Sequence, residues 1–287
     1  MIPDYFIFVP AYNVAATLAG VLGRIPLAVM ERAQVLVIDD GSKDDTRGVY
    51  ETFVAKSAGV AGEASAAGSD CAGSSLAENR AGDNRAAPDL ACADSDCSSA
   101  GLTCADHLQY MRFEFNRGYG AVVKCGISEG LRSGAKYIAC LHGDGQYPAE
   151  QLDEFFAYLE RTPELALVQG SRHAIAGGAR AGNMPLYKRL GGAFLTALEN
   201  IAFRQKLTDR HSGFIVYNAS FLKTLELAKL SPSFDIDLEI ISIADARGWR
   251  IAELPIPTRY AGEKSNLNVV TYGLRVLRQI ARRICMR

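Results

Sequence analysis

The sequence predicts an α/β domain with a mixed, mostly parallel sheet flanked by helices. Short apolar runs rich in Val, Ile, Phe and Tyr recur along the chain, each ends in a polar or Gly-containing turn, and apolar residues at helical spacing follow most of these turns. Strands that alternate with helices indicate βαβ units, whose strands run parallel. The predicted strands span residues 5–9, 35–38, 108–113, 137–141, 165–170, 214–217 and 249–253.

Length and composition indicate a globular protein. The chain has 287 residues, of which 48% are hydrophobic and 22% charged, which suffices for one large domain or two smaller ones. The formal net charge of -1 gives no general basic surface for nucleic acid. No stretch approaches the roughly 20 uncharged apolar residues of a membrane span, and the N-terminus lacks a basic region followed by an apolar one. We therefore expect a cytoplasmic protein.

The composition changes over residues 57–106, where Ala, Gly, Ser, Asp and Cys dominate and large apolar residues are almost absent. Such a segment buries too little surface to offset the entropy of ordering it. We expect one domain over 1–268, interrupted by a disordered insertion at 57–106. The seven cysteines, without a secretion signal, predict free thiols. Those in the insertion lack the paired spacing of zinc sites, so an inert loop is preferred to a metal or redox role.

The predicted central strand, 137–141, leads into side chains that can bind metal or phosphate. His142, Asp144 and Gln146 alternate in sequence, so an extended segment would point all three the same way. They would offer one nitrogen and two oxygen ligands to a divalent cation, at the strand end where open α/β sheets bind ligands. A polar turn without a ligand is the alternative, because Gly-Asp-Gly is ordinary turn chemistry.

Two carboxylates, Asp39 and Asp40, follow the strand at 35–38. Adjacent acids at a strand end need a cation, backbone N–H donors, or the N–H and hydroxyl groups of a ligand such as a base and ribose. Alternatively, one of them only caps the next helix, which we expect over about 43–54.

Cationic and proton-transfer candidates follow other strands. Arg117 precedes two glycines at a helix start, and Arg172 follows the strand at 165–170, so both could approach an anionic ligand such as a metal-bound diphosphate. Asp209 and His211 lie in a polar turn and are candidates for proton transfer. A structural, hydrogen-bonding turn is the alternative for this pair.

Three later segments of the chain hold further candidates for ligand or membrane contact. Residues 175–185 hold three glycines and suit either a lid or a solvated connector. Lys264 lies in a segment rich in Pro and Gly and could reach a phosphate. Residues 269–287 predict a basic amphipathic helix, which is either a membrane-surface anchor or a terminal helix packed on the sheet.

The motifs, taken in order, resemble those of the family 2 glycosyltransferases of GT-A fold. The later ones are similar to the branch that contains dolichyl-phosphate mannosyltransferases and bacterial polyprenyl-phosphate relatives. The resemblance covers nearly the whole chain except the insertion, and it rests on the order and spacing of the motifs together. These are Val9-Pro10-Ala11-Tyr12-Asn13, Ile38-Asp39-Asp40-Gly41-Ser42, Asn116-Arg117-Gly118-Tyr119-Gly120, Asp144-Gly145-Gln146, Gly170-Ser171-Arg172, Asp209-Arg210-His211-Ser212-Gly213-Phe214 and Pro257-Thr258-Arg259-Tyr260 with Lys264.

The resemblance implies a Rossmann-like fold of nucleotide-diphospho-sugar transferases and an inverting reaction. A hexose would pass from a nucleotide-diphosphate sugar, of GDP-mannose or UDP-glucose type, to a polyprenyl or dolichyl phosphate. Asp144 and Gln146 match the second acid and the glutamine of the family's Asp-x-Asp-x-Gln element, which binds Mg2+ or Mn2+. Arg172 and Lys264 would neutralise the leaving group. The implied nucleotide-sugar site comprises Pro10, Tyr12, Asn13, Asp39, Asp40, Gly143, Asp144, Arg172 and Lys264.

Two positions depart from the family pattern. His142 stands where the family has its first Asp, so the metal site uses an imidazole, relies on Asp144 and the diphosphate, or is weaker. Val14 stands where many relatives carry Glu, which leaves GDP and UDP both open. A lipid-phosphate acceptor would leave Asp209 a positioning role, whereas a sugar hydroxyl would make it the candidate base. A glycosyltransferase acting on a sugar hydroxyl, and a nucleotide-sugar-binding protein without turnover, remain the alternatives.

A lipid acceptor would also require the enzyme to work at a membrane. Because the chain shows no membrane span, the enzyme would meet lipid through its C-terminal helix at the cytoplasmic membrane face, or through a membrane-protein partner.

Overall fold

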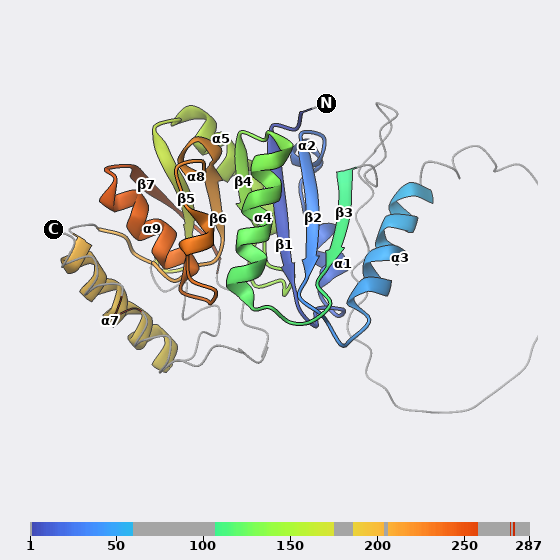
Figure 1. The fold of residues 1–287 in the computed structure, drawn as a ribbon, viewed down its shortest axis with the longest axis horizontal. Helices are drawn as coiled ribbons and strands as arrows, with labels where there is room; N and C mark the ends of the chain where they lie inside the picture. Colours follow the sequence, from blue (N-terminus) through green and yellow to red (C-terminus); the bar gives the residue numbers. More distant parts are fainter. Residues whose placement is uncertain are drawn as a thin grey trace, which may run out of the picture.

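The fold is a seven-stranded sheet between two layers of helices (Figure 1). The computed structural model describes residues 2–59, 107–174, 186–203 and 206–257, together with 276 and 278. All predicted strands are present, with ends that differ by a few residues. They are β1 (Tyr5–Ala11), β2 (Ala33–Asp39), β3 (Leu108–Arg112), β4 (Tyr137–Cys140), β5 (Leu165–Ser171), β6 (Ile215–Asn218) and β7 (Arg250–Pro255).

The strand order is β3-β2-β1-β4-β6-β5-β7. β6 pairs antiparallel with both β4 and β5, and the other pairs are parallel. The predicted mixed, mostly parallel sheet is therefore confirmed. The carboxyl ends of β1, β2, β4 and β5 lie at one edge of the sheet, which is where the candidate site residues gather.

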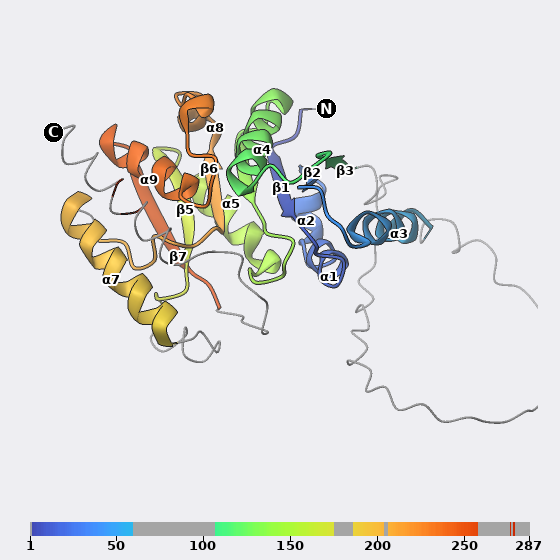
Figure 2. The same ribbon diagram turned by 60° about the horizontal axis from the view of Figure 1, so that its bottom comes forward.

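Helices cover both faces of the sheet (Figure 2). One layer contains α4, α8 and α9, and the other contains α1, α2, α3 and α5. The helices, including two short 3-10 helices, are α1 (Leu18–Leu22), α2 (Leu27–Met30), α3 (Thr46–Gly59), α4 (Tyr119–Ser133), η3 (Ala149–Gln151), α5 (Leu152–Arg161), α7 (Leu186–Phe203), α8 (Ala219–Leu222), η4 (Leu227–Lys229) and α9 (Ile236–Ala246).

The alternation of side chains along β1 explains the two layers. Successive strand residues point to opposite faces. Phe6 and Phe8 join the core under α4, α8 and α9, whereas Ile7 and Val9 join the core under the opposite layer. Because both faces are covered, the strand is apolar at nearly every position, as is usual for parallel sheets.

α4 shows how the sequence fixes one of these helices. Val123 and Ile127 are fully buried, and the helix ends at Gly134, whose φ of +83° suits a glycine C-cap. Gly126 faces Phe8 so closely that a Cβ there would overlap the ring. The helix can therefore lie flat on β1 only with glycine at this position.

Several sequence predictions fall wholly or partly outside the described residues. α3 runs to Gly59, past the expected end near residue 54, so the first three residues of the predicted insertion are helical. The rest of it up to residue 106, the segment 175–185 and Lys264 lie outside the described residues. Within the described ranges, no helix is both long and apolar enough to cross a membrane.

The predicted C-terminal helix is described at two positions. Val276 is fully buried against Leu238 of α9, and Leu195 and Leu198 of α7 pack beside it. Arg278 is exposed. At Val276 the structure therefore agrees with the alternative of a terminal segment packed on the domain.

Candidate functional site

Asp39 closes the turn after β2. The side chain is fully buried, and its Oδ1 accepts a hydrogen bond from the Ser42 backbone N–H at 2.8 Å. Its Oδ2 accepts a second one from the Tyr110 hydroxyl at 2.6 Å, with Arg112 Nε at 3.6 Å. Both carboxylate oxygens thus have protein partners, but Asp39 does not cap the next helix, because α3 begins only at Thr46 and the Thr46 N–H donates to Asp44.

Asp40 holds the glycine-containing segment before α4. Its Oδ1 accepts from the Arg117 N–H at 2.6 Å, and its Oδ2 accepts from the Gly118 N–H at 3.0 Å. Burial raises the pKa of Asp40, although these two N–H donors act in the opposite direction. Of the predicted partners for this acid, backbone N–H groups are the ones present. The contact joins the end of β2 to the start of α4.

The loop after β1 is fixed to the loop after β2. Asn13 has a left-handed backbone with φ of 54°, its Oδ1 accepts from the Lys43 N–H at 2.7 Å, and its N–H donates to Ser42 Oγ at 2.9 Å. Tyr12 is half-buried, and no residue in the described ranges hydrogen-bonds its hydroxyl. The Pro10 carbonyl accepts from the Gly143 N–H at 3.0 Å. These contacts bring the first and central motifs together.

The segment after β4 departs from the predicted geometry. It continues beside β1 as far as Gly143, and then turns. Asp144 Oδ1 accepts from the Gln146 N–H at 3.0 Å, and Gly145 has φ of +77°. The expectation that His142, Asp144 and Gln146 alternate along one extended segment is therefore wrong, because a turn closed by Asp144 intervenes. The polar-turn alternative describes the backbone correctly.

His142 belongs to a buried polar network behind this turn. Its Nε2 lies 3.1 Å from the Tyr119 hydroxyl oxygen. That hydroxyl donates to Asp237 Oδ2 at 2.8 Å, and Tyr217 donates to Asp237 Oδ1 at 3.2 Å. A hydroxyl has one proton, so Tyr119 must accept from Nε2–H of His142. Burial lowers the pKa of His142, and the neutral ring then keeps its lone pair on Nδ1.

The residues at this turn fit a divalent cation, although they do not enclose one. Within the described residues, no three His, Cys, Asp or Glu side chains form a cluster able to hold a metal ion. Asp144 Oδ2 accepts no hydrogen bond from this part of the chain, and His142 Nδ1 carries a lone pair. Mg2+ commonly binds one or two protein carboxylates and completes its coordination with substrate phosphates and water. This donor set suits that kind of shared site.

Arg172 and Asp209 form a two-point ion pair at the end of β5. Arg172 Nε lies 2.7 Å from Asp209 Oδ2, and Nη2 lies 3.0 Å from Oδ1. Burial alone would raise the pKa of Asp209, but the Arg172 charge and hydrogen bonds outweigh it and bring the pKa to about 2. A carboxylate with so low a pKa is a poor general base near neutral pH.

His211 stabilises the same turn. Its N–H donates to Asp209 Oδ1 at 3.1 Å, and its carbonyl accepts from Arg172 Nη2 at 3.0 Å. Burial lowers the pKa of His211 to about 4. For both proton-transfer candidates, the structure supports the alternative of a hydrogen-bonding turn.

Electrostatic contacts place the β4 and β5 ends in one site. The charges of Asp144 and Arg172 both act on the pKa of His142 and of Tyr147. Burial raises the pKa of Tyr147 to about 12, and its hydroxyl accepts from the Gly213 N–H at 2.8 Å. The site therefore combines the turn after β4, the end of β5 and the 209–213 turn.

Sequence reasoning assigned no individual role to three residues that support this site. Tyr119 and Asp237 form the network behind His142. Glu253 of β7 accepts from the N–H groups of Thr208 and Asp209, at 2.6 and 2.9 Å. Local pattern could not reveal them, because each acts on a partner distant in the sequence.

Comparison with solved structures defines the class of the fold. Glucosyl-3-phosphoglycerate synthase of Mycobacterium tuberculosis superposes with a TM-score of 0.58 at 12% identity, over 98% of this chain and 81% of that one. A structure of the same enzyme with Mn2+, uridine diphosphate and glucosyl-3-phosphoglycerate gives a TM-score of 0.57 at 12% identity, over 98% and 80%. The fold is that of the GT-A glycosyltransferases.

Sequence comparison relates part of the chain to a known family. The profile of Glycosyl transferase family 2 matches residues 94–226. An uncharacterized protein of Methanocaldococcus jannaschii is 28% identical over 174 residues, which is 58% of this chain. The UDP-N-acetylglucosamine–dolichyl-phosphate N-acetylglucosaminyltransferase of Methanococcus voltae is 26% identical over 150 residues, and a dolichyl-phosphate beta-glucosyltransferase of Trichomonas vaginalis is 29% identical over 154, each over 52% of this chain. Residues 94–226 of the chain are thus similar to the family 2 glycosyltransferases.

These matches cover the relatives unequally. The aligned stretches make up 68%, 59% and 44% of the three relatives' own lengths, in the order given. The chain thus spans less than two thirds of the second and third.

Proposed function

We propose that the protein transfers a hexose from a nucleotide-diphosphate sugar to a polyprenyl or dolichyl phosphate. The position of the Asp144 carboxylate is the observation that supports binding of a nucleotide-diphosphate sugar. It lies on the turn where β4 leaves the sheet, one oxygen holds that turn, and the other accepts no hydrogen bond from the described residues. A carboxylate in this position can share a divalent cation with a diphosphate.

The nucleoside would lie against the loops after β1 and β2. Asp39, Asp40 and the Asn13 side chain already have protein partners, so their main role is to fix these loops. Tyr12 is the aromatic side chain of this motif that remains half-buried, and it offers a ring face for a base. Recognition would therefore rest on loop shape, on backbone groups near Pro10 and on Tyr12.

Asp144 would hold Mg2+ or Mn2+, with Gln146 and the Nδ1 lone pair of His142 as further donors. Such an ion, when bound, supplies positive charge that stabilises a departing nucleoside diphosphate. Gly143 anchors this turn on Pro10, and a Cβ at Gly143 would lie 3.1 Å from the Pro10 carbonyl oxygen. Arg172 remains the candidate cation for the leaving group, held in place by Asp209. Lys264 keeps its implied role as a second cation.

The chemistry of Asp209 favours a phosphate acceptor over a sugar hydroxyl. A hydroxyl acceptor needs a base, whereas a phosphate monoester is already ionised near neutral pH. Asp209, with its pKa of about 2, and His211, with its pKa of about 4, are both poorly suited to accept a proton there. The names of the Methanococcus and Trichomonas relatives, both transferases to dolichyl phosphate, support the same acceptor class.

An apolar stripe on α7 supports a lipid acceptor. Leu190, Phe194 and Ile201 are 63%, 68% and 78% exposed. Their spacing of four and seven residues places them on one side of the helix. Large exposed apolar groups in a row are costly in water and mark contact surfaces. We assign this stripe to contact with the lipid that carries the acceptor.

Measuring nucleoside diphosphate release tests the proposal. The full chain is incubated with GDP- and UDP-sugars, with and without polyprenyl phosphate, and with and without Mn2+. Release that requires both lipid and metal supports the proposal. Release onto a glycan without lipid supports the sugar-hydroxyl alternative, and donor binding without release supports a binding protein.

Two matched variants test the role of Asp144. Asp144→Asn should lower metal-dependent release by about 100-fold or more while the circular dichroism spectrum stays unchanged. Asp153→Asn, at an exposed acid in the first turn of α5, should keep wild-type activity. Full activity in Asp144→Asn would refute the metal assignment.

A further inference from the structure

We propose that Tyr119 and Asp237 are positioning residues that hold His142 as a ligand for the divalent ion, and that the site therefore selects Mn2+ over Mg2+. The inference rests on the proposed function in one respect, because the ion is the one assigned there to Asp144. Tyr119 begins α4 and Asp237 lies in the first turn of α9, so neither residue is part of the turn that would hold the ion.

The Tyr119 hydroxyl gives its proton to Asp237. It donates to Asp237 Oδ2 at 2.8 Å, and the other neighbours of the hydroxyl oxygen are His142 Nε2 at 3.1 Å and Cys140 Sγ at 3.8 Å. A hydroxyl has one proton and two lone pairs, so Tyr119 accepts hydrogen bonds from both of these neighbours. His142 is therefore protonated on Nε2, and the neutral ring carries its lone pair on Nδ1.

Nδ1 is the ring nitrogen of His142 that is left for a ligand. A Cβ at Gly213 would lie 2.6 Å from Nε2 and 2.9 Å from Cε1, so these two ring atoms pack against the 209–213 turn. No residue in the described ranges hydrogen-bonds Nδ1, and the His142 side chain is partly exposed. The charge of Asp144 acts on the pKa of His142, so the two groups lie close enough to interact.

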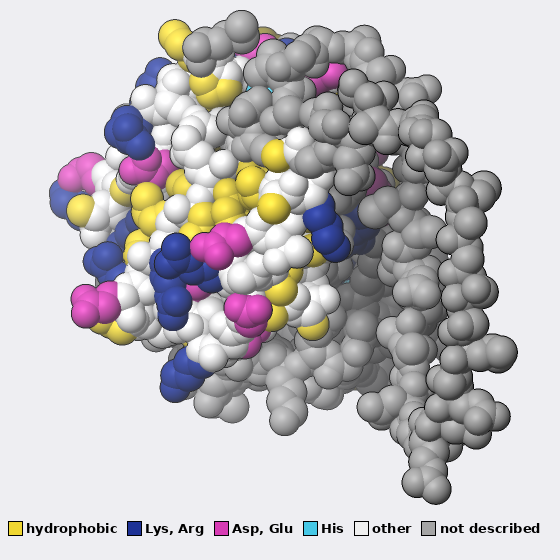
Figure 3. Space-filling model, turned by 90° about the vertical axis from the view of Figure 1, so that its right-hand side faces the viewer, with side chains coloured by type: hydrophobic (Ala, Val, Ile, Leu, Met, Phe, Trp, Pro, Cys, Tyr) yellow, Lys and Arg dark blue, Asp and Glu magenta, His cyan; other side chains and the backbone are white. Residues whose placement is uncertain are grey.

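Asp237 forms no ion pair with any described residue. Several exposed acids pair with Lys or Arg, and side chains of both signs lie together on the side of the molecule that carries α3 and β3 (Figure 3). Asp237 is buried instead, and its partners are the hydroxyls of Tyr119 and Tyr217, the latter at 3.2 Å. An ionised carboxylate accepts hydrogen bonds and cannot donate them. It therefore fixes the direction of the Tyr119 hydroxyl and, through it, the tautomer of His142.

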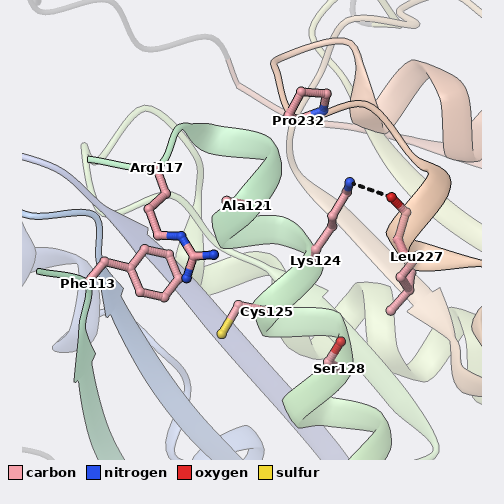
Figure 4. A pocket seen from close by; sticks show the side chains of 9 residues that line it. Phe113, Arg117, Ala121, Lys124, Cys125, Ser128, Leu227 and Pro232 are labelled. Atoms are coloured by element: carbon pink, nitrogen blue, oxygen red, sulfur yellow. Dashed lines mark hydrogen bonds between the residues drawn. The ribbon is translucent and has the colours of Figure 1, made fainter. Parts of the chain in front are cut away.

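Contacts between α4 and the segment before α9 keep Tyr119 beside Asp237. Figure 4 shows the segment from Leu227 to Pro232 next to α4, where the Lys124 ammonium donates to backbone carbonyls of this segment. The Phe234 ring stacks on the Tyr119 ring, with 5.3 Å between the ring centres. The position of the Tyr119 ring is thus fixed by packing, as a preorganised site requires.

An imidazole ligand affects which ion the site prefers. Metal-bound histidines usually donate their other ring N–H to a second group, which fixes the tautomer and the orientation of the ring. Tyr119 is that group for His142. Mg2+ takes oxygen ligands, whereas first-row transition-metal ions also bind imidazole nitrogen. With His142 as a ligand, the site therefore favours Mn2+ over Mg2+.

Nitrogen NMR of the tag-free full chain, without metal, tests the tautomer. Long-range proton–nitrogen spectra distinguish a ring nitrogen that carries a proton from one that carries a lone pair. We expect His142, identified by the loss of its signals in His142→Asp, to be protonated on Nε2 at pH 8. His107 provides the opposite tautomer as a reference, because its Nδ1 lies 2.9 Å from the Ala33 carbonyl, which can only accept. A wild-type His142 protonated on Nδ1 would overturn the proposal, whatever the variants below show.

Tyr119→Phe and Tyr217→Phe form a matched pair. Each removes one hydroxyl that is bound to Asp237, but only the Tyr119 hydroxyl also contacts His142. Tyr119→Phe should lose the preference for the Nε2–H tautomer and weaken Mn2+ binding by about ten-fold or more. Tyr217→Phe should keep both properties. Equal effects of the two substitutions would leave the network a structural role only and would refute the proposal.

Electron paramagnetic resonance of Mn2+ tests the ligand directly. Mn2+ is added to the tag-free protein alone and with pyrophosphate, which stands in for the donor diphosphate and contains no nitrogen. We expect nitrogen hyperfine coupling in the wild type and its loss in His142→Asp. Because that substitution replaces a nitrogen ligand by oxygen, it should also lower the ratio of Mn2+ to Mg2+ affinity, measured by competition. Absence of nitrogen coupling in both samples, or an unchanged ratio, would contradict the assignment of His142.

These measurements separate the inference from the proposed function, because none of them uses a sugar donor or an acceptor. Nitrogen coupling without glycosyl transfer would support the ligand assignment and refute the transfer. Metal-dependent transfer without nitrogen coupling would support the transfer and refute the roles of His142, Tyr119 and Asp237.

Discussion

The guanidinium of Arg172 and the carboxylate of Asp209 are joined by two hydrogen bonds, although the two residues lie 37 positions apart. The arginine side chain is 14% exposed and the aspartate side chain 1%. An ion pair this well shielded loses little strength to solvent, and removal of one partner leaves a buried charge. The pair therefore fixes the end of β5 against the 209–213 turn.

We expect Asp209→Asn to lower the free energy of unfolding at pH 7 by about 3 kcal/mol, because Arg172 loses its buried counter-charge. Urea denaturation measures this. Glu226→Gln is the matched control, because its partner Lys229 is 75% exposed and Glu226 itself 68%, and exposed pairs contribute about 1 kcal/mol or less. Equal stability of the two variants would contradict the structural role of the pair.

The same pair predicts an acid-sensitive stability. The folded-state pKa of Asp209, about 2, lies below its ordinary value of 3.8. Its contribution is therefore complete above about pH 4 and is lost as the pH falls towards 2. The difference in unfolding free energy between wild type and Asp209→Asn should shrink over that range, as followed by urea denaturation at several pH values. If the difference in unfolding free energy between the two proteins stayed constant from pH 5 to pH 2, the predicted acid sensitivity would be wrong.

Asp237 predicts the opposite pH dependence. Burial raises its pKa from 3.8 to about 6, although the hydroxyls of Tyr119 and Tyr217 oppose the rise. The folded state then favours the protonated acid, so its contribution is complete below about pH 4 and is lost as the pH rises through 6. Relative to Asp237→Asn, the wild type should lose roughly 3 kcal/mol between pH 4 and pH 8. The titration of His211 is common to both proteins and cancels in the difference. If the difference in unfolding free energy between the wild type and Asp237→Asn did not change with pH, Asp237 would be solvated.

Two helical glycines form a matched pair. A Cβ at Gly126 would overlap the buried Phe8 ring, whereas a Cβ at Gly20 would meet no heavy atom within 4 Å. Gly126→Ala should therefore cost about 1–3 kcal/mol through overpacking, and Gly20→Ala should stabilise the protein by up to about 1 kcal/mol through helix propensity. Thermal unfolding of both variants measures the contrast. Stabilisation by both substitutions would mean that α4 shifts away from β1.

The fold could be predicted from the sequence because its signals are local. The run from Val35 to Ile38 is buried on both sides, so it is apolar throughout, and the sequence shows this directly. The motif at Asp144 follows such a run, which places it at the carboxyl edge of the sheet. The predicted direction of the side chains at this motif was wrong. The turn at Gly145 depends on backbone angles that the alternation of residues in the sequence does not encode.

The partners of the site residues could not be predicted, because they come from distant positions. Asp39 binds the hydroxyl of Tyr110, which lies 71 positions later, and Asp40 binds the N–H of Arg117, 77 positions later. An acid at a strand end looks the same in the sequence whether a ligand or the protein satisfies it. The tertiary structure decides this, and here the protein satisfies both.

The stripe on α7 gives the sharpest test of the lipid acceptor. Leu195 and Leu198 turn towards Val276 and α9, while Leu190, Phe194 and Ile201 remain exposed. If the stripe lies against the lipid that carries the acceptor, a charge on it costs energy only when a bilayer is present. We expect Phe194→Glu to lower transfer to polyprenyl phosphate in vesicles by about ten-fold, and to leave transfer to a short-chain, water-soluble acceptor unchanged.

Leu27→Glu provides the control for that test, because Leu27 is an exposed apolar residue, 43% accessible, on a different helix. Leu27→Glu should leave transfer to both acceptors unchanged. It therefore shows whether a loss of transfer requires a charge on α7 or follows from an added surface charge anywhere. Equal loss on both acceptors in Phe194→Glu would indicate damage to the fold or the site. Full vesicle activity in that variant would show that α7 does not meet lipid, and the acceptor would then have to reach the site from another face.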